Sequence, residues 1–228
     1  MSPEQVKIGS LDALQVKGAA GGPCVILCHG FGANAFDLAP LAAHVKARPG
    51  TTWIFPQAPI EFNIAPGMRG RAWFPLVAEE LARLVASGKD VSFSEVVPPG
   101  LASAREKLEE LVDKLPFARN QITIGGFSQG AMMATDLFLR STELFAGLVL
   151  LSGTLICEKE WKALAPAKSG FQFFQSHGMY DPVLPFENAK RLEELLRNAG
   201  LSGEFIAFPG MHEIPEGVLK RMAIYLTR

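Results

Sequence analysis

The sequence lacks both a strong charge imbalance and a long apolar run. Its 228 residues carry 22 basic and 23 acidic side chains, for a net charge of −1. This balance offers no global attraction to nucleic acid or anionic lipid, so neither is an expected partner. No apolar stretch approaches the roughly 18 residues of a membrane span, and the N-terminal residues do not resemble a signal peptide. We therefore expect a cytoplasmic protein without stable membrane insertion.

Cysteine is also scarce. Cys24, Cys28 and Cys157 are an odd number and lack the spacing of a zinc site, so we expect no metal. Cys24 and Cys28 lie four residues apart on a predicted strand, which separates their Cα atoms by about 13 Å, too far for a disulfide. All three are predicted to be reduced, buried thiols.

What the sequence does contain is enough apolar material for a sizeable core. Apolar residues make up 48% of the chain and charged residues 20%, as in a globular protein. No repeat, low-complexity tract or linker divides it, so we expect one domain over residues 1–228.

Short, mostly apolar segments alternate with amphipathic ones. Helical spacing marks residues 101–115 and 189–199, and residues 131–139 are apolar nearly all round. This alternation predicts an α/β fold, a doubly wound, mostly parallel sheet with helices on both faces. Residues 6–16 are expected to add an antiparallel hairpin at the sheet edge. Residues 58–100, rich in proline and glycine, are expected to form part of a pocket wall or a partial lid. The predicted core strands are residues 25–29, 52–56, 122–126, 148–151, 171–176 and 204–208.

The segment Gly126-Phe-Ser-Gln-Gly130 joins a predicted strand to a predicted helix and matches GxSxG. In a nucleophile elbow of this pattern, the serine sits on a strained turn with its hydroxyl above the sheet, here Ser128. Side chains at positions 126 and 130 would crowd the packing of helix against strand. About one chance match is expected per ten chains of this composition, so the context must support the motif.

Ser128 needs a base, because a serine hydroxyl is a poor nucleophile near neutral pH. In hydrolases with this elbow the chain order is serine, acid, histidine, which excludes His29 and His44. His212 lies in a loop after a predicted strand, at the edge where a site is expected. His177 also follows Ser128, but it comes directly after a strand and precedes the best acid. We therefore predict His212 as the base.

The acid must lie between Ser128 and His212 and follow a strand. Asp181, in Ser176-His-Gly-Met-Tyr-Asp-Pro-Val183, meets both conditions. An aspartate before proline also initiates turns, which is the structural alternative for this residue. The other acids of the interval fall on helices or a connector, or start a strand: Asp136, Glu143, Glu158, Glu160, Glu187, Glu193, Glu194 and Glu204.

Acyl transfer also needs donors for the tetrahedral oxyanion, each contributing up to about 4 kcal/mol. One predicted donor is the Gln129 N–H, at the start of the helix that follows the nucleophile. The second is the Phe31 N–H, in an early loop where Gly30 and Gly32 let the backbone bend. His29 is then expected to brace this loop rather than act as a base.

The motifs His29-Gly-Phe-Gly32, Gly126-Phe-Ser-Gln-Gly130-Ala, His177-Gly-Met-Tyr-Asp-Pro182 and Gly210-Met-His212 occur in this order. From about residue 20 to the C-terminus, the chain resembles the phospholipase/carboxylesterase family of α/β hydrolases, which includes acyl-protein thioesterases. The resemblance implies the α/β-hydrolase fold, a triad of Ser128, Asp181 and His212, and no cofactor.

The same resemblance implies hydrolysis of carboxylic esters, and in some members of acyl thioesters or lysophospholipids. Arg71-Ala-Trp-Phe74 is similar to a family segment near the acyl pocket, which makes Trp73 and Phe74 candidates for substrate contact. Pro75 stands where an aspartate is common in the family. The alternative interpretation of Trp73 and Phe74 is that they are ordinary aromatic residues of the core. Residues 77–97 are longer than in compact members, as a partial lid would require.

The leading hypothesis is a serine carboxylesterase that forms an acyl-enzyme with small or medium acyl esters, as a monomer or homodimer. Acyl-protein thioesterase and lysophospholipase are the alternatives within the same chemistry. A dienelactone-type or carbon–carbon hydrolase is a further enzyme alternative, although dienelactone hydrolases typically carry cysteine where Ser128 stands. A non-catalytic binding protein with this fold is the alternative of a different class, but it would be expected to lack a triad residue.

Overall fold

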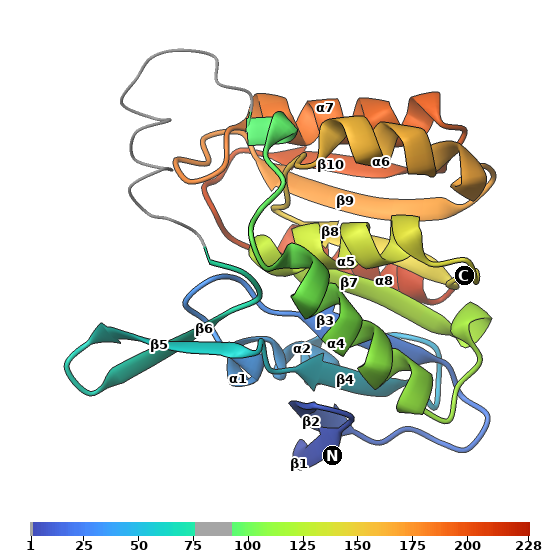
Figure 1. The fold of residues 1–228 in the computed structure, drawn as a ribbon. Helices are drawn as coiled ribbons and strands as arrows, with labels where there is room; N and C mark the ends of the chain where they lie inside the picture. Colours follow the sequence, from blue (N-terminus) through green and yellow to red (C-terminus); the bar gives the residue numbers. More distant parts are fainter. Residues whose placement is uncertain (1, 76–92) are drawn as a thin grey trace.

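A computed structural model describes residues 2–75 and 93–228 as an eight-stranded sheet with helices on both faces (Figure 1). The strand order is β1-β2-β4-β3-β7-β8-β9-β10. Strands β4, β3, β7, β8, β9 and β10 run parallel, whereas β1 pairs antiparallel with β2 and β2 with β4. The strands are β1 (Glu4–Ile8), β2 (Leu11–Val16), β3 (Cys24–Cys28), β4 (Thr52–Pro56), β7 (Ile122–Phe127), β8 (Gly147–Leu151), β9 (Gln172–Gly178) and β10 (Ser202–Phe208).

Two apolar layers cover the two faces of this sheet. Strands β3, β4 and β8 are buried along their whole length, which explains why their sequences are apolar without alternation. One layer contains the buried faces of α4, α5, α6 and α7, and the opposite layer contains those of α1 and α8. The helices are α1 (Ala35–Leu38), α2 (Leu41–His44), α4 (Leu101–Lys114), α5 (Gln129–Arg140), α6 (Glu158–Leu164), α7 (Phe186–Asn198) and α8 (Glu216–Leu226).

The strand order changes direction at β3, next to β7. From β3, the chain continues to β4 on one side, and β7, β8, β9 and β10 follow in order on the other side. Ligands of doubly wound sheets bind at such a switch point, beyond the carboxyl ends of the strands. The predicted α/β-hydrolase fold is confirmed, and the expected N-terminal hairpin is present as β1 and β2.

A second, two-stranded sheet was not predicted. Strands β5 (Ile60–Ala65) and β6 (Met68–Ala72) form an antiparallel hairpin closed by Pro66 and Gly67, with Gly67 at φ +77°. In Figure 1 the hairpin extends beyond the main sheet, on the side where the parallel strands end. It accounts for the first part of the stretch 58–100. The predicted partial lid falls largely on residues 76–92, which lie outside the described residues.

Three short 3-10 turns complete the described chain. They span Phe93–Glu95, Arg119–Gln121 and Ala165–Lys168. The turn at Phe93–Glu95 is attached to α6 and α7 by a shared carboxylate, because Glu158 accepts from the Ser94 hydroxyl at 2.5 Å and from Arg191 at 2.6 Å. Side chains of two helices therefore fix this turn to the main body.

Candidate active site

Ser128 occupies the sharp turn between β7 and α5. Its backbone has φ 54° and ψ −119°, a conformation that costs a non-glycine residue about 1–3 kcal/mol. The Ser128 N–H donates to Leu151 O at 2.8 Å, and its side chain does not cap α5. Ser128 is 8% exposed. The hydroxyl is thus held on a strained turn at the switch point, as a nucleophile elbow requires.

The two glycines of the elbow are required by close packing. A Cβ at Gly130 would lie 2.0 Å from the Cys28 carbonyl oxygen, and a Cβ at Gly126 would lie 2.4 Å from the Gly130 carbonyl carbon. Both distances are far inside van der Waals contact with backbone atoms that cannot move aside. The steric purpose predicted for these glycines is confirmed, and it keeps the start of α5 directly against β3 and β7.

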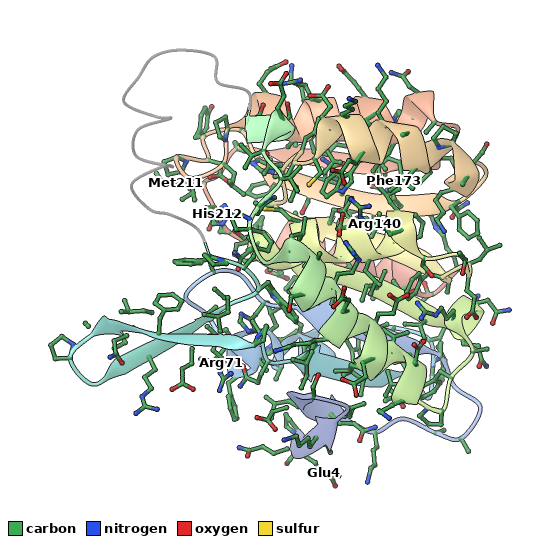
Figure 2. The ribbon with its side chains drawn as sticks, in the orientation of Figure 1. Glu4, Arg71, Arg140, Phe173, Met211 and His212 are labelled. Atoms are coloured by element: carbon green, nitrogen blue, oxygen red, sulfur yellow. The ribbon has the colours of Figure 1, made fainter. Side chains whose placement is uncertain are left out.

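His212 stands beside the elbow. It lies in the loop between β10 and α8. The centroid of its ring is 4.8 Å from the ring centroid of Phe127, the residue before Ser128. Figure 2 shows His212 at the same edge of the molecule as the β5-β6 hairpin. Its Nδ1 is 2.7 Å from Asp181 Oδ2, so Nδ1 carries a proton and Nε2 is left for a reaction partner.

Asp181 lies in the loop after β9 and is hydrogen-bonded on both oxygens. Oδ1 accepts from the backbone N–H groups of Val183 and Leu184 at 2.8 and 2.9 Å. Oδ2 accepts from His212, and His177 Nε2 lies 3.2 Å from the same oxygen. Burial alone would raise the pKa of Asp181, but the hydrogen bonds outweigh it and hold the pKa well below the usual range. The carboxylate is therefore charged at neutral pH.

The loop after β3 is the second wall of the site. Gly30 packs directly against the elbow, since a Cβ there would lie 3.2 Å from Ser128 Cβ. The loop is attached to β6 by the bonds Gly32 N–H to Arg71 O, 2.9 Å, and Arg71 N–H to Ala33 O, 3.1 Å. Phe31 is 40% exposed. Its backbone N–H, the predicted second oxyanion donor, is thus carried by a loop fixed at the edge of Ser128.

His29 stabilises this loop through hydrogen bonds of its buried side chain. It is fully buried, and its Nδ1 donates to Gly30 O at 2.8 Å while its Nε2 accepts from Ala58 N–H at 3.1 Å. Burial lowers the pKa of His29 to about 4, so the imidazole is neutral at physiological pH. These contacts agree with the bracing role expected for His29.

Gln129 contributes a contact that sequence reasoning missed. Its buried side chain accepts from Trp73 N–H at 2.9 Å and donates to Phe74 O at 2.8 Å. The Trp73 indole N–H in turn donates to His29 O at 2.9 Å. A continuous chain of hydrogen bonds therefore joins the start of α5 to the loop that carries Phe31.

The burial of Trp73 and Phe74 bears on their predicted substrate contact. Trp73 is 1% exposed, Phe74 is fully buried, and both belong to the apolar core. Their burial favours the interpretation as core residues. Their backbone groups hydrogen-bond the Gln129 side chain, so they stabilise the start of α5 next to Ser128. Apolar side chains that are exposed at this edge are Phe31, Ile64, Met68, Met179, Tyr180, Val183 and Met211.

The rival acid Asp136 and the three cysteines do not contribute to this site. Asp136, one of the rival acids, is fully buried on α5, where it binds Arg105, Arg140 and the Trp161 indole. The cysteines Cys24, Cys28 and Cys157 are free and buried, as predicted, and burial raises the pKa of each thiol, to about 12 for Cys24 and Cys157.

Two absences hold for residues 2–75 and 93–228. No group of three histidine, cysteine, aspartate or glutamate side chains in these residues is arranged to hold a metal ion. None of the helices described there is long and apolar enough to cross a membrane.

Known proteins resemble this chain in sequence and in fold. A family model described as Phospholipase/Carboxylesterase matches residues 13–228. Acyl-protein thioesterase 1 of Emericella nidulans is 28% identical over 191 residues, which cover 78% of this chain and 77% of the relative.

Two solved structures share the fold. Esterase PE8 superposes with a TM-score of 0.75 at 25% identity, covering 97% of this chain and 98% of that one. The Bacillus cereus carboxylesterase superposes with a TM-score of 0.74 at 22% identity, covering 95% and 93%.

Proposed function

The chain belongs to the phospholipase/carboxylesterase family, and from this premise we propose that it is a serine carboxylic-ester hydrolase acting through an acyl-enzyme on Ser128. The observation that carries the proposal is the hydrogen bond from His212 to Asp181, made directly beside the strained turn of Ser128. A buried carboxylate, a histidine oriented by it and a serine at an elbow are the parts that activate a hydroxyl. The family and its relatives make the protein a hydrolase.

In the proposed mechanism, His212 Nε2 takes the Ser128 proton as Oγ attacks the substrate carbonyl. The tetrahedral oxyanion accepts hydrogen bonds from the backbone N–H groups of Gln129 and Phe31. Collapse of this intermediate breaks the bond to the leaving group, which receives the proton from the His212 imidazolium. Water then attacks the acyl-enzyme with the same base, releasing the carboxylic acid and restoring the Ser128 hydroxyl. Asp181 keeps the proton of His212 on Nδ1 throughout.

Hydrolysis of an acyl thioester is the second candidate function. It is favoured by the relative named acyl-protein thioesterase 1, whose match covers most of both chains. The same residues would serve, because an ester and a thioester differ in the leaving group rather than in the oxyanion that must be stabilised. A lysophospholipid is a third substrate of the same chemistry. We propose that the enzyme works in the cytoplasm, as a monomer or homodimer.

Replacing the nucleophile tests the proposal. Ser128→Ala should abolish turnover of a p-nitrophenyl ester, apart from the roughly 10³- to 10⁴-fold acceleration over water that triad-less enzymes retain. Ser103→Ala, on the exposed face of α4, is the matched control and should keep full activity. Near-normal turnover by Ser128→Ala would contradict the assignment. Rates on p-nitrophenyl esters of two to sixteen carbons, an acyl thioester and a lysophospholipid then decide between the candidate substrates.

A further inference from the structure

Two histidines, not one, lie within hydrogen-bond distance of the same carboxylate oxygen of Asp181. His212 Nδ1 lies 2.7 Å and His177 Nε2 lies 3.2 Å from Oδ2. The two approach from different elements, His212 from the β10-α8 loop and His177 from the end of β9. Only His212 stands at the elbow, through its ring contact with Phe127. His177 therefore lies next to the proposed acid but has no role in the proposed mechanism.

The surroundings of His177 define its protonation. Its side chain is fully buried, and Nε2 is also 2.8 Å from Leu184 O. Because Nε2 faces two acceptors, it carries a hydrogen shared between them. In the part of the chain that the structure describes, Nδ1 is buried without a hydrogen-bond partner. A hydrogen on Nδ1 would have no acceptor there, so the geometry favours the tautomer with its hydrogen on Nε2.

We propose that His177 is a positioning residue, which donates to Asp181 Oδ2 and holds the carboxylate in the orientation from which this oxygen binds His212. This inference rests on the proposed function, since it acts through Asp181. Rotation of a carboxylate about its last side-chain bond is only weakly restricted by itself. The N–H groups of Val183 and Leu184 fix Oδ1, and His177 is the donor that fixes Oδ2 independently of the base.

The same contact tunes the strength of the Asp181–His212 interaction. If His177 donates as proposed, the negative charge of Asp181 is shared among four donors, three of which are the N–H groups of Val183, Leu184 and His212. When the His177 donor is removed, the buried Oδ2 has His212 as its one remaining donor among the described residues. The carboxylate then attracts an imidazolium at His212 more strongly. The acid limb of the pH–rate profile, which reports protonation of the base, should therefore move to higher pH.

Few other charged groups in the described residues face this pair. Glu213, next to His212, directs Oε1 to the backbone N–H of Met211 at 3.1 Å. On the opposite side of the elbow, His29 is held neutral by the burial that lowers its pKa to about 4. His29 therefore stays neutral between pH 5 and 8, so we assign a shift of the acid limb in that range to the Asp181–His212 pair.

Two amide substitutions separate the hydrogen bond from simple space filling. In His177→Gln the amide nitrogen stands as far from Cα as Nε2 does, so it can donate to Asp181. In His177→Asn the same amide group is one carbon shorter and falls short of Oδ2. His177→Asn should lower kcat about tenfold or more with KM changed less than about threefold, because His177 does not touch the substrate. Its acid limb should rise by about 0.5 pH unit or more, and His177→Gln should restore both values.

An unmoved or lowered acid limb in His177→Asn, or a His177→Gln variant no better than His177→Asn, would overturn the inference. Fluorophosphonate labelling of Ser128 in the same samples keeps this failure distinct from failure of the proposed function. If His177→Asn does not fold, NMR of ¹⁵N-histidine in the wild-type protein decides. The inference predicts that His177 carries a hydrogen on Nε2, and an Nδ1–H tautomer without one would refute it.

Discussion

The side chain of Gln129 is expected to couple stability to oxyanion binding, and Gln129→Met tests this. Methionine has a similar length and no branch, so it fills the space but leaves Trp73 N–H and Phe74 O without the partners they have now. An unsatisfied buried polar group costs about 1–3 kcal/mol, so the free energy of unfolding should fall by about 2–6 kcal/mol. For a chain of this length, each kcal/mol lowers Tm by about 2–4 °C.

The effect on catalysis follows from the path of these hydrogen bonds. Gln129 holds Trp73, Trp73 holds His29 O, and His29 supports the loop that carries Phe31. Loosening this loop displaces one of the two proposed oxyanion donors, and the loss of one donor costs about 10²- to 10³-fold in kcat. We expect Gln129→Met to lose about tenfold or more, since the donor is displaced rather than deleted.

Gln175→Met is the matched control for this prediction. Gln175 is 1% exposed on β9, and its amide donates to Ala189 O on α7 at 2.7 Å. The change removes this hydrogen bond and also a buried Oε1 that has no partner among the described residues, so it should cost at most about 1–3 kcal/mol while kcat stays near the wild-type value. Thermal unfolding and kcat on a p-nitrophenyl ester, with the affinity for a boronic acid that mimics the tetrahedral intermediate, measure both effects. If Gln129→Met destabilised the protein no more than Gln175→Met and kept full kcat, the proposed path would be wrong.

Three further predictions concern single positions. Asp181→Asn should lower kcat about 10⁴-fold in an ester assay. The folded-state pKa of Asp181 is depressed, so the carboxylate stabilises the fold above pH about 4, and this stabilisation is lost as the pH falls further. The difference in unfolding free energy between wild type and Asp181→Asn should therefore shrink below pH about 4. Gly130→Ala should prevent normal folding in circular dichroism, since its Cβ would lie 2.0 Å from Cys28 O, whereas Gly217→Ala in α8 meets no atom within 4 Å and should be tolerated. Asp136→Ala should cost about 3–5 kcal/mol in chemical denaturation, because it leaves two arginine side chains without their buried partner, with kcat of the folded fraction unchanged.

The core of the fold was predictable because it depends on local pattern. Residues 52–56 form β4 with the expected bounds, since a strand buried on both faces needs an uninterrupted apolar run. The helix predicted over 101–115 ends at Lys114, one residue earlier than expected. Such elements follow from the burial pattern whatever the rest of the chain does.

The β5-β6 hairpin was missed although the sequence carries a signal for it. Ile60, Phe62 and Ile64 alternate with polar residues, and Pro66-Gly67 follows as a turn. Proline and glycine in the same stretch outweighed this alternation and indicated an irregular loop. The hairpin matters for the site, because β6 binds the loop that carries Phe31.

The candidate site was predictable in outline and not in its supporting contacts. Chain order and position after a strand selected Ser128, Asp181 and His212, because parallel strands end at one edge of the sheet. That His177 and His212 share one oxygen of Asp181 depends on two loops meeting in space, which no spacing rule reports. The side-chain contacts of Gln129 depend in the same way on the fold around them.

Covalent labelling of the nucleophile tests the central proposal most directly. A fluorophosphonate reacts with a serine that a base has activated, and peptide mass spectrometry locates the adduct. We predict one adduct on Ser128 in the wild-type protein and its disappearance in His212→Ala. An adduct on another residue, or labelling of Ser128 that persists undiminished in His212→Ala, would contradict the proposed active site.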